Sequence, residues 1–247
     1  LARAKEMIGW DEKYPRRVLP NGHIRGVGLA MAMQGSAISG IDVGGATLKV
    51  GDEGMVNLLI GAADMGTGCD TTLAQVAAEC LEVPVDQVIT AQVDTDTSPY
   101  DSGSYASSTA FLTGGAVYKC AQTLIGKIKA EAARQKGWNP EDVEYHDALV
   151  EHIPTGETVT LAEVANVSEC GGVPIIATEN HTCPNSPPPF MVGAAEIDLD
   201  PETGKVTLVE YDAVVDCGTP LNINLARVQT EGGLVQGIGM ALTETVR

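Results

Sequence analysis

The sequence predicts an α+β fold in which mixed β-sheets are flanked by helices and the chain divides into two lobes. Strand-like and helical stretches alternate irregularly, and tight turns join neighbouring strands. Glycine is enriched, at 28 of 247 residues, without any repeat, which is typical of tight turns and close backbone contacts. A doubly wound fold would need a regular alternation of strand and helix, so mixed sheets fit better.

The first half of the chain is expected to form short strands and amphipathic helices. A Gly-Asp-Glu-Gly turn at 51–54 separates two strand-like stretches, and apolar residues recur at helical spacing in two later stretches. The expected elements are a helix ending near residue 8, strands at 24–34, 46–50 and 55–61, a helix at 71–81, a strand at 88–93 and a long helix at 114–136.

The second half is expected to add a short helix, three strands and a final helix. Thr160 and Glu163 have the spacing of a capping box, which predicts that a helix begins there. The Asp-Pro-Glu-Thr-Gly sequence at 200–204 predicts a turn between two strands. The expected elements are strands at 175–178, 191–199 and 205–215 and a helix from Arg227 to the end of the chain.

These elements are expected to form a first lobe at 1–137, a connecting segment at 138–174 and a second lobe at 175–247. The connecting segment contains fewer apolar residues than the segments on either side of it. Both ends lie inside helical patterns without a cap, which favours a chain truncated at both ends over a small subunit processed at both ends.

Composition excludes several classes of function. The net charge is −18, with no cluster of basic residues, which excludes a nucleic-acid binder. Apolar runs are too short to span a membrane, and no signal peptide opens the chain. The six cysteines form no Cys-x-x-Cys pair, so neither an Fe–S cluster nor a zinc site is expected within the chain, and a reducing cytoplasmic compartment is favoured. The acidic residues are expected to be solvated.

A short pattern occurs twice: a strand, an Asp-x-Gly-Thr loop at 64–67 or 216–219, and then a helix. Glycine loops at helix N-termini present N–H groups and a positive dipole end to anions. The two loops could therefore hold two ends of a phosphorylated ligand, or the match could be coincidence.

A loop rich in hydroxyl groups, at 98–109, precedes the long helix. Five hydroxyls within eight residues suit a phosphate or a polar heterocycle bound by neutral donors. The alternative is an ordinary polar loop with serine and threonine caps.

Other patterns in the sequence are weaker indications of function. Gly26 and Gly28 begin a near match to a dinucleotide fingerprint, but the third position is Met31 and no helix follows. His181 and Cys183 are interpreted as structural residues in a loop. The four glycines at 232–239 indicate a helix packed closely against either another backbone or a cofactor.

Three stretches, 61–77, 103–114 and 216–239, together resemble the molybdopterin-binding subunit of the xanthine dehydrogenase/aldehyde oxidase family of molybdenum hydroxylases. The resemblance covers nearly the whole chain. It implies the α+β fold of a molybdenum cofactor-binding domain, and a molybdenum ion held by the dithiolene of a pterin, in some members as its cytosine dinucleotide, without side-chain ligands. This agrees with the absence of a metal-ligand pattern in the sequence.

The resemblance also implies cofactor-binding residues. The family has a Gly-Gln-Gly element where this sequence has Thr67 between two glycines. The residues that match cofactor-contacting positions are Gly66, Thr67, Gly68, Ser104, Ala106, Ser107, Ser108, Thr109 and Gln229. The family's catalytic glutamate would lie beyond the C-terminus, because Glu157 lies on the wrong side of the Gly-rich helix. No catalytic residue is therefore expected within the chain.

The implied function is that of part of an oxidoreductase. Such an enzyme hydroxylates an N-heterocycle (a xanthine-like purine) or an aldehyde with oxygen derived from water, and Fe–S and FAD domains or subunits carry the electrons away. The expected partners are these, the remainder of the molybdenum subunit and a small-molecule substrate, but neither nucleic acid nor membrane. The isolated chain is expected to be inactive. The alternative is a non-catalytic scaffold module derived from a molybdopterin subunit.

Overall fold

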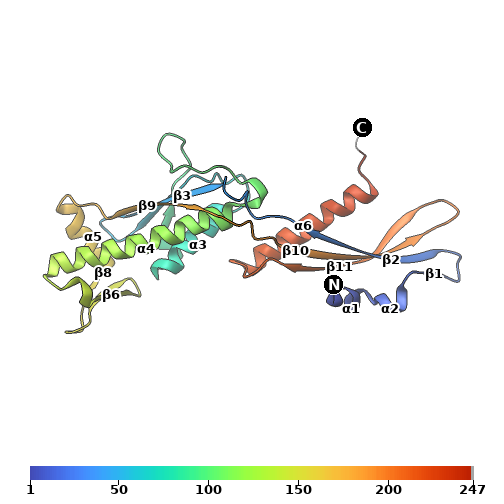
Figure 1. The fold of residues 1–247 in the computed structure, drawn as a ribbon, viewed down its shortest axis with the longest axis horizontal. Helices are drawn as coiled ribbons and strands as arrows, with labels where there is room; N and C mark the ends of the chain where they lie inside the picture. Colours follow the sequence, from blue (N-terminus) through green and yellow to red (C-terminus); the bar gives the residue numbers. More distant parts are fainter. Residues whose placement is uncertain (246–247) are drawn as a thin grey trace. The chain divides into compact units, whose positions relative to one another are not determined.

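The computed structural model describes residues 1–245 and divides the chain into two compact units. Unit 1 comprises Leu1–Gly35 and Pro188–Arg247, and unit 2 comprises Ser36–Pro187. Each unit contains its own principal four-stranded sheet (Figure 1).

Unit 1 is an antiparallel sheet in the order β1-β2-β10-β11. Its elements are α1 (Ala2–Ile8), α2 (Trp10–Lys13), β1 (Arg16–Val18), β2 (Ile24–Met33), β10 (Phe190–Leu199), β11 (Val206–Asp216) and α6 (Ile223–Leu242). Ala4 and Ile8 of α1 are fully buried, and α1 contacts β10 and β11. Side chains of β10, β11 and α6 line a mainly apolar groove of about 340 Å³.

Unit 2 is built on a mixed sheet in the order β5-β4-β3-β9, in which only β4 and β5 are parallel. Its main elements are β3 (Val43–Val50), β4 (Val56–Ile60), α3 (Cys69–Leu81), β5 (Val88–Thr90), α4 (Thr109–Lys136) and β9 (Ile176–Thr182). Helix α4 contacts β3, β9 and α3, and the core lies between these elements. Its largest fully buried side chains include Leu48, Leu58, Ile60, Leu73, Leu81, Leu124 and Ile128.

A second, small sheet completes unit 2. It consists of β6 (Val143–His146), β7 (Leu149–His152) and β8 (Glu157–Thr160), and α5 (Leu161–Cys170) follows it. Thr160 and Glu163 form the predicted capping box. Short 3₁₀ turns lie at Val85–Gln87, Tyr105–Ser107 and Pro140–Asp142.

The structure confirms the α+β class and the mixed sheets, but its units differ from the predicted lobes. The stretch 138–174, predicted as a connecting segment, forms β6, β7, β8 and α5 inside unit 2. Unit 1 joins the two ends of the chain, because β2 pairs with β10 across more than 150 residues. The pairing of β2 with β10 leaves no local signal, because the two strands are far apart in sequence. Strands β6, β7 and β8 pair with their neighbours along the chain, but each has only four residues and therefore shows little alternation of apolar and polar side chains.

Several elements begin earlier than predicted. Helix α4 begins at Thr109 and not at residue 114, and β3 begins at Val43. Helix α6 begins at Ile223, where Asn222 accepts hydrogen bonds from two backbone N–H groups, and it ends at Leu242. Glycines caused the first two differences, because they weaken a local pattern even where tertiary packing requires them. The last two residues of the predicted final helix, 246–247, lie outside the described residues.

Three acidic residues predicted to be solvated are buried. The exposed fractions of Asp42, Glu131 and Glu196 are 1%, 7% and 2%. Each carboxylate accepts a hydrogen bond or pairs with a cation, as buried charge requires. Among the described residues, no helix combines the length and apolar character needed to cross a membrane.

Candidate functional site

The hydroxyl-rich loop lies over two strands of unit 2 at positions where only glycine fits. A Cβ atom added to Gly45 would lie 2.5 Å from the Tyr100 carbonyl oxygen, and one added to Gly61 would lie 2.3 Å from that of Pro99. Side chains cannot approach backbone that closely. These two glycines therefore let the chain at 99–101 cross the sheet in direct contact with it.

The same loop is fastened by side-chain hydrogen bonds. Ser102 donates its N–H to the Val43 carbonyl, and its Oγ accepts from the Val43 N–H at 2.9 Å. Asp101 accepts from the Gly103 N–H at 2.9 Å and from the Thr113 Oγ1 at 2.7 Å. The loop is thus tied both to β3 and to the second turn of α4.

Beyond these anchors the backbone takes an unusual course. Ala106 and Ser107 both adopt left-handed conformations, with φ of 46° and 56°. Such conformations cost free energy for residues other than glycine, and they cluster at ligand-binding sites. The Ser104 and Ser107 side chains are exposed, and the Ser104 and Thr109 hydroxyls lie 2.5 Å apart. Ser108 is 2% exposed and its hydroxyl donates to the Gly103 carbonyl within the loop.

This loop leads directly into an open helix N-terminus. Within the described chain no side chain caps α4 at Ser108, and Phe111 and Leu112 donate back to the Ser108 carbonyl. The N–H groups of Thr109 and Ala110 remain available, at the positive end of a 28-residue helix. In contrast, α5 is closed by its capping box. An anion would be stabilised at the N-terminus of α4 by these N–H groups and by neighbouring hydroxyls.

The loop at Gly66–Gly68 has a different chemistry from the predicted one. The Asp64 carboxylate accepts hydrogen bonds from the N–H groups of Gly66, Gly68 and Asp70, at 2.9, 3.1 and 3.3 Å. These bonds hold the pKa of Asp64 below its usual value. The N–H groups that were predicted to bind the anion of a ligand therefore already donate hydrogen bonds to the Asp64 carboxylate. Thr67 remains exposed on this loop.

Acidic and thiol groups surround the start of α3. Atoms of Asp64, Cys69 and Asp70 that could ligate a metal lie within 4.8 Å of one another. Burial, and then the charge of Asp64, raise the pKa of Asp70, and burial raises the pKa of the Cys69 thiol. Both Asp64 oxygens already accept hydrogen bonds from backbone N–H groups, so the carboxylate serves the shape of the loop.

The chain that leads from β4 toward the Gly66–Gly68 loop passes against the hydroxyl-rich loop in unit 2. Gly61, which leads into the Gly66–Gly68 loop, lies against Asp101 of the hydroxyl-rich loop, since a Cβ added to Gly61 would be 2.5 Å from the Asp101 Cβ. The sequence alone did not predict a role for Asp101. The only local pattern around it is an aspartate two residues before a glycine, which is typical of many turns.

Gln229 and the second Asp-x-Gly-Thr loop belong to unit 1. Gln229 is exposed on α6, and Asp216 accepts from the Gly218 N–H at 3.1 Å, as Asp64 does from Gly66. A Cβ added to Gly232, Gly233 or Gly237 would meet no atom of the described chain within 4 Å. Close packing within unit 1 therefore does not explain these three glycines.

His181 and Cys183 are packing residues, although His181 lies in strand β9 and not in a loop. The His181 ring fits against Gly115 of α4, where an added Cβ would be 2.4 Å from it, and lies edge-on to Phe111. Burial lowers the pKa of His181. The Cys183 thiol donates to the Asn185 carbonyl. No nucleophile–base pair is formed.

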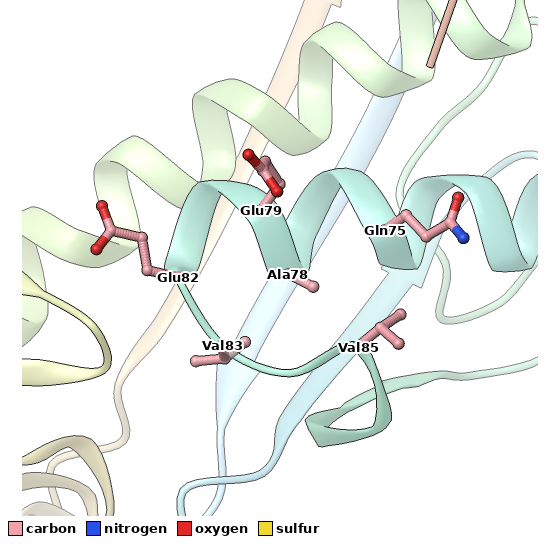
Figure 2. A pocket seen from close by; sticks show the side chains of 6 residues that line it. All are labelled: Gln75, Ala78, Glu79, Glu82, Val83 and Val85. Carbon is pink, nitrogen blue, oxygen red and sulfur yellow. The ribbon is translucent and has the colours of Figure 1, made fainter. Parts of the chain in front are cut away.

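A separate hollow of about 330 Å³ lies along α3, lined by Gln75, Ala78, Glu79, Glu82, Val83 and Val85. Figure 2 shows Gln75 and Glu79 extending from the helix and Val83 and Val85 from the segment after it. Two carboxylates and no cation line it, so it does not suit an anionic ligand.

Comparison with known proteins gives the family. The model of the molybdopterin cofactor-binding domain matches residues 3–247. The chain is 33% identical over its whole length to the probable hypoxanthine oxidase XdhD of Escherichia coli (strain K12), covering 26% of that protein. It is 31% identical to the xanthine dehydrogenase molybdenum-binding subunit of Escherichia coli O157:H7, covering 99% of this chain and 34% of that subunit.

A solved structure shares the fold. Quinoline 2-oxidoreductase from Pseudomonas putida 86 matches 96% of this chain and 33% of its own chain, with a TM-score of 0.83 and 24% sequence identity. The chain thus spans about a quarter to a third of the length of these three relatives. These findings confirm the resemblance drawn from the three sequence stretches: the chain belongs to the molybdopterin cofactor-binding domain family.

Proposed function

We propose that the chain forms a cofactor-binding part of a molybdenum hydroxylase, and that the N-terminus of α4 with its hydroxyl-rich loop holds a phosphate of the pterin cofactor. The observation that carries the proposal is the uncapped start of α4 beside two left-handed residues and exposed hydroxyls. Thr109 and Ala110 would donate N–H groups, and Ser104, Ser107 and Thr109 would donate hydroxyls. Ala106 would contribute backbone only, and Ser108 would hold the loop in shape.

The remaining residues would have supporting roles. Thr67, exposed between Gly66 and Gly68, would face the cofactor with a hydroxyl where the family has an amide. Gln229 of unit 1 would bind through its side-chain amide. When bound, the cofactor supplies the two-electron oxidation of an N-heterocycle (a xanthine-like purine) or an aldehyde, with oxygen from water. The chain's own residues would bind and orient it and exclude water.

The charge of the loop favours the dinucleotide form of the cofactor. Residues 98–112 contain no lysine or arginine, and Asp101 lies within them. A phosphate monoester approaches two negative charges at neutral pH, whereas the phosphates of a dinucleotide carry one each. A site of neutral donors beside a carboxylate would tolerate the single charges better. We therefore favour the cytosine dinucleotide form.

The same proposal extends to location and partners. The six cysteines are free, which supports a reducing, cytoplasmic location. The molybdenum-binding relative is a subunit by name, which supports Fe–S and FAD domains or subunits beside the remainder of the molybdenum subunit. Turnover is expected of that whole enzyme and not of the 247-residue chain alone. A small molecule, and not nucleic acid or a membrane, would be its substrate.

Replacing Thr109 by aspartate tests the phosphate site without weakening the fold. A carboxylate in the first turn should leave stability unchanged or raise it by about 0.3–1 kcal/mol, because it complements the helix dipole. It should also repel the phosphate and lower molybdenum and pterin content at least about tenfold, equivalent to roughly 1.4 kcal/mol. Thr97→Asp adds the same charge at an exposed position of the preceding segment and is the matched control.

Both variants are made in the full-length protein that contains this chain. Molybdenum content is measured by elemental analysis, and pterin content is measured after the pterin has been released from the protein. Thr97→Asp should retain wild-type content. Wild-type content in a folded Thr109→Asp protein would contradict the placement of the phosphate at α4.

A further inference from the structure

The end of β4, the hydroxyl-rich loop and the second turn of α4 meet at one half-buried side chain, that of Asp101. One of its oxygens accepts from the Gly103 N–H at 2.9 Å and the other from the Thr113 hydroxyl at 2.7 Å. Its Cβ and backbone N–H lie against Gly61, at 2.5 and 2.9 Å from the position that an added Cβ would occupy. It therefore contacts the end of β4, the hydroxyl-rich loop and the second turn of α4.

We infer that Asp101 is a positioning residue, which fixes the hydroxyl-rich loop on the N-terminus of α4 so that its donors point at one place. This inference rests on the proposed function. Asp101 does not itself touch the ligand, because a carboxylate there would repel an anion and both of its oxygens are engaged.

The strained backbone explains why such a residue is needed. Left-handed Ala106 and Ser107 persist only where the surrounding contacts determine the conformation. After the strained residues, the Ser108 Oγ donates to the Gly103 carbonyl at 3.2 Å and the Thr109 hydroxyl lies 2.5 Å from that of Ser104. Gly103 is itself held by Asp101. Removing the carboxylate therefore frees Gly103, to which Ser108 is bonded from the other side of the strained stretch.

The test compares Asp101→Ala with Asp101→Asn in the full-length protein. Asparagine can accept from the Gly103 N–H and donate to the Thr113 hydroxyl, so it should rescue the loop. In Asp101→Ala, amide hydrogen exchange at 103–109 should quicken about tenfold, as expected from losing hydrogen bonds to a charged acceptor. Molybdenum and pterin content should fall by a similar factor. Asp96→Ala, an exposed aspartate of the preceding loop, is the control and should change neither quantity.

Two readouts separate this inference from the proposed function. Hydrogen exchange is measured on protein prepared without cofactor, so it tests Asp101 even if the wild-type protein binds no molybdenum or pterin. Unchanged exchange at 103–109 in Asp101→Ala would overturn the positioning role. So would faster exchange with full cofactor content. If Asp101→Ala does not fold, Thr113→Val removes one of the same bonds from the helix side and should produce the same local change in smaller measure.

Discussion

Replacing Glu196 by alanine is expected to cost about 3 kcal/mol of folding free energy, the largest single effect among the charged residues of unit 1. Glu196 lies in β10 and is 2% exposed. Its carboxylate lies 2.7 Å from the Lys13 Nζ, contacts the Arg17 guanidinium, and is 3.8 Å from the Arg25 Nη1. Truncation leaves three cations side by side without their shared anion, and a cavity where the side chain was.

The control is an exposed pair in the same unit. The Arg3 and Glu6 side chains are 67% and 71% exposed and lie 2.9 Å apart. Glu6→Ala should therefore cost less than about 1 kcal/mol. Chemical denaturation gives both values. If Glu196→Ala lost no more stability than Glu6→Ala, the buried cluster would not hold α2, β1 and β10 together.

The same cluster predicts a dependence on pH. Burial opposes ionisation of Glu196, but Lys13 and Arg17 outweigh it and hold its pKa below the usual value. A group whose pKa is depressed in the folded state contributes stability above its unfolded pKa of about 4.3, and this is lost as pH falls through the folded pKa. The difference in stability between wild type and Glu196→Gln should therefore shrink as the pH falls below about 4.3. A difference independent of pH would contradict this assignment.

Replacing Gly44 by alanine is the second large effect, expected to cost about 2–3 kcal/mol. A Cβ atom at Gly44 would lie 2.6 Å from the Thr113 nitrogen and 2.7 Å from the Leu112 carbonyl carbon. Both are backbone atoms of α4, so neither can rotate away, and the helix must shift on the sheet. Because Thr113 also binds Asp101, the hydroxyl-rich loop should move with the helix and cofactor content should fall.

Gly126 supplies a matched control on the same helix. It is exposed, and an added Cβ meets nothing within 4 Å. Gly126→Ala should therefore stabilise the protein by about 0.5–1 kcal/mol through helix propensity alone. Comparing the Tm values of the two variants separates the effect of the clash between β3 and α4 from the effect of helix propensity. Equal shifts in Tm would show that α4 does not rest on β3 at Gly44.

The sequence predicted those features that depend on local periodicity. Helix α3, the turn at 51–54 and the capping box of α5 follow from apolar spacing and from turn and cap residues that act within a few positions. Strand β1 has three residues and no alternation to detect. The pairing of β2 with β10 leaves no local trace, because strands so distant in sequence are joined only by the fold.

The candidate site was predictable in its residue types but not in its chemistry. The hydroxyl-rich loop was placed correctly before α4, yet the two glycines 114–115 hid the true start of the helix at Thr109. The Gly66–Gly68 loop has the expected shape, but its N–H groups turn inward to Asp64. The role of Asp101 depends on contacts with Gly61 and Thr113, which only tertiary structure provides.

Elemental analysis of the full-length protein, purified natively with its associated chains, tests the central claim most directly. Roughly stoichiometric molybdenum with releasable pterin, and iron alongside, is the result expected of a working molybdenum hydroxylase. A folded complex that repeatedly contains neither molybdenum nor pterin would contradict the proposed cofactor site and favour the non-catalytic scaffold.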